Sequence, residues 1–158
     1  MGPQPVLIRA DASVAIGTGH VMRDLVLAKA LRREGVPVTW LCRPLPEAVR
    51  ALLREAGFPI IQIESTPGPA EAAAVINAAA ALDAQAVIVD HYRLDAAVEA
   101  RIRGAGFPLM AVDDMYAPHD CDLVLNQNLY ASRDAYRGRV PLDCRILAGW
   151  RYALLREE

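Results

Sequence analysis

Residues 16–23, Ile-Gly-Thr-Gly-His-Val-Met-Arg, carry the side chains best suited to chemistry. Gly17 and Gly19 flank Thr18 and let the backbone approach a ligand closely, directly before a predicted helix. His20 falls in the first turn of that helix, where the positive end of the macrodipole disfavours imidazolium, so we expect a neutral ring near pH 7. A neutral imidazole beside open space can act as a general base. Alternatively, His20 caps the helix or packs beneath the loop.

This segment does not match the common phosphate-binding or nucleophile motifs. Met22 stands where a dinucleotide-binding Gly-x-Gly-x-x-Gly motif needs its third glycine, and no Gly-Lys-Ser/Thr follows, as a P-loop would require. The chain also lacks the Gly-x-Ser-x-Gly elbow of a serine nucleophile. A ligand bound at this loop is therefore of another class.

Other polar residues follow short apolar runs. Because the carboxyl ends of parallel strands meet at one edge of a sheet, we expect these residues to gather there and form a binding site. The candidates for substrate binding in this set are Asp11, Arg43, His91, Tyr92 and Asn128, with Gly17, Thr18, Gly19 and Arg23 from the first segment.

Several of these side chains have two interpretations. Asp90 is expected to orient His91 through a ring N–H, and Tyr92 to stack on or hydrogen-bond a sugar-sized ligand. Alternatively, these residues belong to a loop that merely packs. Arg23 and Arg43 either contact phosphate or sugar or serve as ion-pair partners at the surface.

Two acidic clusters do not suggest a site of their own. Asp113 and Asp114 are adjacent, so their side chains diverge on an extended segment, and a turn role suits them better than a glycosidase carboxylate pair. The consecutive residues 119–122, His-Asp-Cys-Asp, do not have the spacing of a standard metal site. We therefore predict no metal.

The elements that must position these groups alternate along the chain. Continuously apolar strands are buried on both faces, and the helices between them supply the cover, so we predict an α/β fold with a doubly wound parallel sheet. The predicted strands are 6–8, 36–41, 59–63, 86–89, 109–112 and 123–125; the predicted helices are 21–34, 47–56, 70–82 and 96–103. Beyond residue 126 the regularity fades, and the structure of 146–155 is left open.

Composition excludes several classes of protein. The 158 residues suit one domain, and 54% apolar with 23% charged residues exclude disorder. A net charge of -2, with scattered arginines, predicts neither nucleic acid nor a membrane surface as a partner. Three cysteines without a Cys-x-x-Cys pair favour a reduced, cytoplasmic setting. We expect no signal peptide, and charged and amide side chains interrupt the most apolar stretch, 70–89, which excludes a membrane span.

Read together, these segments resemble one family. Arg-Ala-Asp-Ala-Ser at 9–13, followed by the Gly-Thr-Gly-His loop, is its most specific feature; Asp-His-Tyr at 90–92 and Asn-Gln-Asn at 126–128 also fit. The chain resembles the UDP-2,4-diacetamido-2,4,6-trideoxy-β-L-altropyranose hydrolases of pseudaminic acid biosynthesis, the PseG family. The resemblance covers the whole chain up to residue 156.

The resemblance implies a Rossmann-like domain, the N-terminal half of a glycosyltransferase-B type fold related to the MurG transferases. It implies hydrolysis at the anomeric carbon that releases UDP with inversion and needs no metal or other cofactor. His20 would deprotonate the attacking water, and Tyr92 would lie by the sugar. The residues agree: a nucleoside diphosphate leaves as a stabilised anion, so one base suffices where a glycosidase needs two carboxylates.

Two departures from the family stand out. Asp24 occupies a position where the family commonly has cysteine, which we expect to alter loop packing. Residues 1–158 would form a single domain with the UDP-binding C-terminal domain absent, so that the isolated chain is weakly active or inactive. The alternatives are the acceptor-binding domain of a MurG-like glycosyltransferase and a non-catalytic module that binds a sugar or a partner domain.

Overall fold

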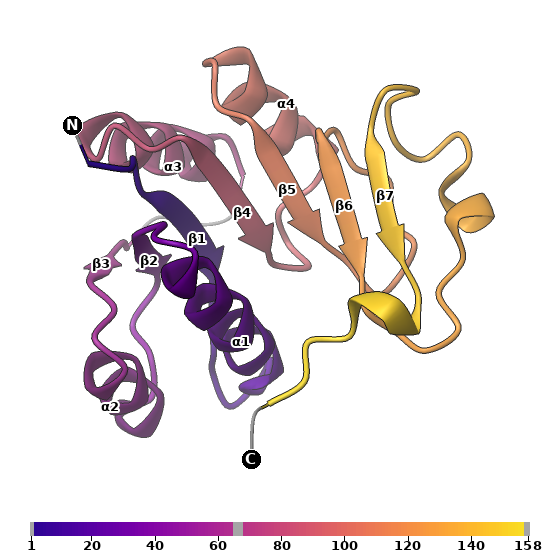
Figure 1. The fold of residues 1–158 in the computed structure, drawn as a ribbon. Helices are drawn as coiled ribbons and strands as arrows, with labels where there is room; N and C mark the ends of the chain where they lie inside the picture. The colour runs from indigo at the N-terminus through magenta and orange to yellow at the C-terminus, as the bar shows by residue number, and fades with distance from the viewer. Residues whose placement is uncertain (1, 65–67, 157–158) are drawn as a thin grey trace.

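A computed structural model describes residues 2–64 and 68–156. Within these residues, one parallel sheet is flanked by helices on both faces (Figure 1). The strands are β1 (Val6–Ala10), β2 (Val38–Cys42), β3 (Ile60–Gln62), β4 (Ala86–Asp90), β5 (Leu109–Val112), β6 (Leu123–Asn126) and β7 (Arg145–Ala148). The α-helices are α1 (Gly19–Arg33), α2 (Glu47–Glu55), α3 (Pro69–Ala81) and α4 (Ala96–Gly104), and two short 3-10 helices are η1 (Arg133–Tyr136) and η2 (Trp150–Tyr152).

The strand order places the predicted site at the centre of the sheet. The strands run β3-β2-β1-β4-β5-β6-β7, so the chain builds outward from β1 and then returns to the other side of it at β4. Ala10 pairs with Asp90 at the carboxyl ends of these two strands. In doubly wound sheets, a ligand crevice opens where the strand order reverses in this way. Asp11 and His91 directly follow the two strands that flank this crevice.

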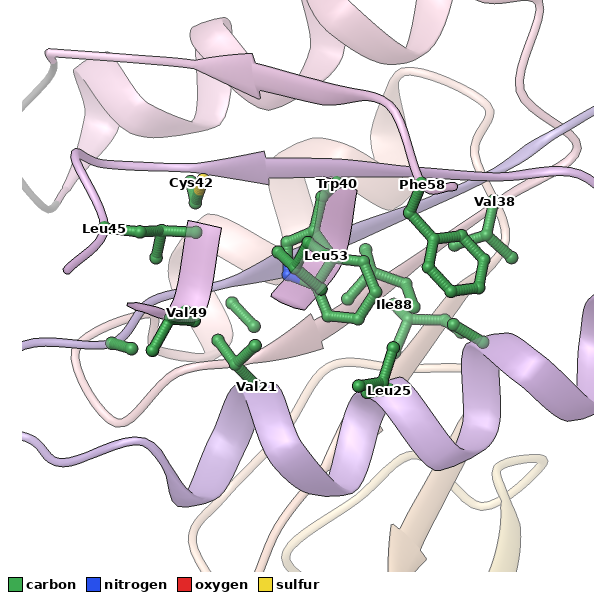
Figure 2. Packing of buried hydrophobic residues seen from close by; sticks show 14 of the residues in the cluster. Val21, Leu25, Val38, Trp40, Cys42, Leu45, Val49, Leu53, Phe58 and Ile88 are labelled. Atoms are coloured by element: carbon green, nitrogen blue, oxygen red, sulfur yellow. The ribbon is translucent and has the colours of Figure 1, made fainter. Parts of the chain in front are cut away.

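Each face of the sheet has its own core. One core joins α1 and α2 to alternate strand residues such as Ile8, and the other joins α3 and α4 to residues of the opposite face such as Leu7. Figure 2 shows Val21 and Leu25 of α1 packed towards Trp40, which is fully buried. Burial of one such side chain contributes about 2 kcal/mol, which holds α1 firmly against the sheet. The first turn of α1 is thereby fixed at the carboxyl edge.

The predicted fold class is confirmed. Every predicted helix and strand is present, with boundaries within two residues of those expected. The strand β7 was not predicted; it extends the sheet beside β6, with Leu147 opposite Leu125. None of the helices among the described residues is long and apolar enough to cross a membrane.

Candidate active site at the β1–β4 crevice

The glycine-bearing loop leads from β1 into α1 as a tight turn. Ser13 and Gly17 exchange backbone hydrogen bonds, and Gly17 has a φ of 74°, in the left-handed region that favours glycine. Gly19 opens α1, and a Cβ added there would meet no described atom within 4 Å. Gly17, Thr18 and Gly19 are all exposed. The turn thus requires Gly17, whereas Gly19 leaves open space before the helix.

His20 is paired with Asp90 at the end of β4. Its Nδ1 lies 2.5 Å from Asp90 Oδ1. Burial would raise the pKa of Asp90, but the hydrogen bonds and charges of Arg23 and His20 outweigh it and hold this pKa below its usual value. An ionised carboxylate only accepts hydrogen bonds, so Nδ1 carries the hydrogen. In the neutral ring, Nε2 then holds the free lone pair that a general base needs.

Arg23 completes this pairing. Its Nε donates to Asp90 Oδ2 at 2.6 Å, its Nη2 donates to Asp90 Oδ1 at 2.5 Å, and its Nη1 reaches Asp114 Oδ2 at 3.2 Å. Of its two predicted interpretations, the structure places Arg23 in ion pairs, one with the buried Asp90 and one with the partly exposed Asp114. The helix macrodipole is therefore not the main electrostatic influence on His20, because a carboxylate and a guanidinium both touch its ring.

The prediction that Asp90 orients His91 is wrong. His91 Nε2 lies 2.9 Å from Asp11 Oδ2, and its Nδ1 accepts a hydrogen bond from the backbone N–H of Arg93. Successive side chains on an extended segment point to opposite faces. Asp90 follows Ile88 towards α1, whereas His91 turns to the loop after β1.

A hollow of about 260 Å³ lies beside His20. Although His20 is only 6% exposed, it lines this hollow. Its ring packs edge-to-face against the ring of Tyr92, with the two ring centroids 4.5 Å apart. Tyr92 is 58% exposed, and its hydroxyl donates to Asp114 Oδ2 at 2.9 Å. The lining residues are Ile16, Gly19, His20, Arg23, Tyr92, Asp114 and Gln127.

Asn128 is exposed and does not line this hollow; its neighbour Gln127 does. Asp114 also lines the hollow but was not predicted to do so, because two adjacent aspartates indicate a turn. Their divergence, however, is as predicted. Asp113 turns inward to Tyr136 and His119, whereas Asp114 faces the hollow.

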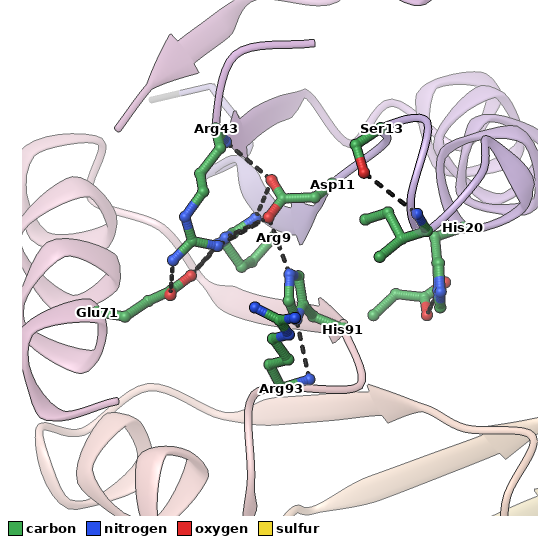
Figure 3. A network of polar contacts seen from close by, with 10 residues as sticks. Arg9, Asp11, Ser13, His20, Arg43, Glu71, His91 and Arg93 are labelled. Atoms are coloured by element: carbon green, nitrogen blue, oxygen red, sulfur yellow. Dashed lines mark hydrogen bonds and ion pairs between the residues drawn. The ribbon is translucent and has the colours of Figure 1, made fainter. Parts of the chain in front are cut away.

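A second hollow, of about 370 Å³, adjoins the first and shares Ile16 with it. Asp11, Arg43 and His91 line it, above a network of buried charges (Figure 3). Arg43 donates to Asp11 Oδ2 at 2.9 Å and to Glu71 Oε2 at 2.5 Å. As with Arg23, the structure places Arg43 in ion pairs.

Arg9 and Glu71 form the floor of this network, and both are fully buried. Arg9 donates to Asp11 and Glu71, and these contacts outweigh the burial that would otherwise lower the pKa of Arg9. Burial would likewise raise the pKa of Asp11, but its hydrogen bonds with His91 and Arg9 lower it instead. In the sequence, only its position as a charged residue in an apolar strand could have indicated that Arg9 is functional. Nothing in the pattern of its helix singled out Glu71.

The cluster at 119–122 lies on another side of the sheet and ties α4 to β5. His119 Nδ1 is 2.7 Å from Glu99, and its Nε2 is 3.2 Å from Asp113, an ion pair without hydrogen-bond alignment. Asp122 pairs with Arg103. Among the described residues, no group of three or more His, Cys, Asp or Glu could hold a metal ion.

Comparison with known proteins identifies a relative. Over 154 residues the chain is 36% identical to the UDP-2,4-diacetamido-2,4,6-trideoxy-beta-L-altropyranose hydrolase of Campylobacter jejuni. The chain is homologous to the N-terminal half of this hydrolase. The match covers 97% of the chain and 52% of the hydrolase, so the chain spans about half the length of this relative.

The fold has a known counterpart among solved structures. MurG of Acinetobacter baumannii superimposes with a TM-score of 0.63 at 18% identity, over 92% of this chain and 45% of that protein. This likeness shows a shared fold, that of one half of a glycosyltransferase-B type protein. No family model matches the sequence.

Proposed function

We propose that this chain is the base-bearing half of a UDP-sugar hydrolase, with His20 as the catalytic base. The observation that carries the proposal is the His20–Asp90 pair beside an open hollow, in a chain homologous to such a hydrolase. The substrate would be the UDP-linked diacetamido-trideoxy sugar named for the homologue. Pseudaminic acid biosynthesis, which the family resemblance implies, and a cytoplasmic location belong to the same proposal.

The proposed reaction needs one proton acceptor. Nε2 of His20 takes a proton from water while the water oxygen bonds to the anomeric carbon of the sugar. The bond from that carbon to the diphosphate oxygen breaks, and its electron pair leaves with UDP. Because UDP is already a stable anion, no acid has to protonate it. The proposed reaction therefore does not need the carboxylic acid that a glycosidase uses to protonate its leaving group.

The charges around the first hollow favour a sugar over a diphosphate. Asp90 and Asp114 face Arg23, whose guanidinium is already engaged with both. Asp114 and Gln127 can accept hydrogen bonds from sugar hydroxyl and acetamido N–H groups. The exposed ring of Tyr92 offers a stacking surface beside them.

In this proposal, a further domain, supplied in cis or in trans, holds most of the UDP. The remaining candidate residues have supporting roles: Gly17, Thr18 and Gly19 shape the entrance to the first hollow, and Asp11, Arg43 and His91 border the substrate from the second hollow. Asn128, outside both hollows, contacts the substrate from its exposed loop. The chain on its own would be weakly active or inactive.

The test is a chimaera in which this chain replaces the matching half of the Campylobacter hydrolase. Hydrolysis of the named UDP-sugar is measured by UDP release for the chimaera and for the chain alone. We expect turnover by the chimaera, and His20→Ala should abolish turnover while UDP affinity stays within about twofold. Lys29→Ala, an exposed change on the same helix, is the matched control.

Three results would redirect the proposal. Loss of UDP binding in His20→Ala would make His20 a ligand contact and not a base. A sugar joined to an acceptor hydroxyl, in place of free sugar, would identify a MurG-like transferase. Sugar binding without any turnover by the chimaera would indicate a non-catalytic module.

A further inference from the structure

Asp24 is a buried acid that the proposed reaction does not use. It lies on α1 one turn after His20, so that the two side chains share a face of the helix. The residue is 0% exposed, and no described residue donates a hydrogen bond to either carboxyl oxygen. An ionised carboxylate buried in this way is strongly unfavourable. The position therefore favours a neutral carboxyl group, which has an O–H to donate.

The neighbour of Asp24 is Asp90, the carboxylate that holds His20. Burial, followed by the negative charge of Asp90, raises the pKa of Asp24 well above its usual value, and the charge of Arg23 opposes this rise only in part. A carboxylate has about four acceptor positions, of which His20 and Arg23 occupy three on Asp90. One position remains for the Asp24 hydroxyl.

We propose that Asp24 is a positioning residue, which donates a hydrogen bond from its neutral carboxyl group to Asp90 and so fixes the tautomer and orientation of His20. His20, Arg23 and Asp24 are spaced at i, i+3 and i+4 on α1, so all three share one face of the helix, and His20 and Arg23 both bond Asp90 at the end of β4. The consequence for catalysis rests on the proposed function; the hydrogen bond itself does not.

The family resemblance predicted only altered loop packing at position 24. The structure instead places Asp24 within the helix, fully buried and on the face that carries His20. Without Asp24, Asp90 would lose one of the groups that hold it in place. We then expect His20 to populate its second neutral tautomer, in which Nε2 carries the hydrogen and cannot accept a proton.

The hydrogen bond can be tested by NMR on the 158-residue chain. At pH 7, the side-chain ¹³C signal of Asp24 should be that of a neutral carboxyl group, and in urea it should change to that of a carboxylate. The ring ¹⁵N signals of His20 should show hydrogen on Nδ1 in the wild type and in Asp24→Asn, whose amide still donates. In Asp24→Ala they should show a mixture of tautomers. With three histidines in the chain, the signals can be assigned by single substitutions.

Activity of the chimaera provides the second measurement. Asp24→Ala should lower kcat about 10-fold without changing KM, while Asp24→Asn stays within about threefold. An ionised Asp24 at pH 7, or an unchanged His20 tautomer in Asp24→Ala, would overturn the inference. If Asp24→Ala does not fold, the wild-type carboxyl signal and the Asp24→Asn tautomer decide the question. If the tautomers behave as expected but no protein hydrolyses the UDP-sugar, the proposed function fails and the positioning role stands.

Discussion

His119 joins α4 to the end of β5, and its charge should make the stability of the protein depend on pH. Its ring lies between the carboxylates of Glu99 and Asp113. Burial alone would lower the pKa of His119, but its contacts with the charged Asp113 and Glu99 outweigh it and raise this pKa from 6.5 to about 9. We predict that His119→Gln destabilises the protein most at acidic to neutral pH.

The expected magnitude follows from this rise in pKa. At about 1.4 kcal/mol for each pH unit, a rise from 6.5 to about 9 corresponds to about 3 kcal/mol. The two partners respond differently: the pKa of Asp113 is lowered, whereas burial leaves that of Glu99 raised. Because burial of Glu99 outweighs the effect of the pairing on its pKa, part of the gain at His119 is offset, and we expect a loss of about 2 kcal/mol at pH 6.

The sign is set by the direction of the change in His119. A group whose pKa is raised by folding stabilises the protein fully below its unfolded value, and that stabilisation disappears as the pH rises through the folded value. The contribution of His119 should therefore be complete below pH 6.5 and nearly lost by pH 9.5. Thiols of the unfolded chain ionise in the same range, but they do so in both proteins and cancel in the difference.

The assay is urea unfolding followed by circular dichroism at pH 6, 7.5 and 9.5. The difference in free energy of unfolding between wild type and His119→Gln should shrink from about 2 kcal/mol to under about 0.5 kcal/mol. Arg137→Gln, which removes a fully accessible ion pair with Asp134, is the control and should show a small difference independent of pH. A difference for His119→Gln that is equal at pH 6 and 9.5 would refute the reasoning.

Two further predictions concern the carboxylates of the β1–β4 crevice. Glu71→Ala should lower the free energy of unfolding by about 3 kcal/mol in urea at pH 7, because it removes a partner from the buried Arg9 and from Arg43, while the exposed Glu55→Gln should change it by less than about 0.5 kcal/mol. Asp90→Asn in the chimaera should reduce kcat at least about 100-fold, because an amide N–H facing Nδ1 moves the ring hydrogen of His20 to Nε2. Turnover near that of the wild type would show that Asp90 does not set the tautomer.

Local sequence patterns were sufficient for the fold class and for the described α-helices and strands other than β7. Apolar runs such as 86–89 predict strands that are buried on both faces, and helical spacing predicts the helix that follows the glycine loop. Both patterns depend only on residues close together in the sequence, so they can be recognised without knowing which segments pack against one another. The strand β7 was missed because its four residues begin with the exposed Arg145 and lie at the edge of the sheet, where one neighbouring strand suffices.

The sequence by itself also determined the edge at which the candidate site lies, since polar residues follow most strands and parallel strands end together. Only the tertiary structure decided which groups meet there. Asp90 binds His20, 70 residues away, and His91 binds Asp11, 80 residues away, although local order suggested that Asp90 and His91 pair. Such pairings depend on strand order and on the face to which each side chain points, and both are set by packing between segments distant in the chain.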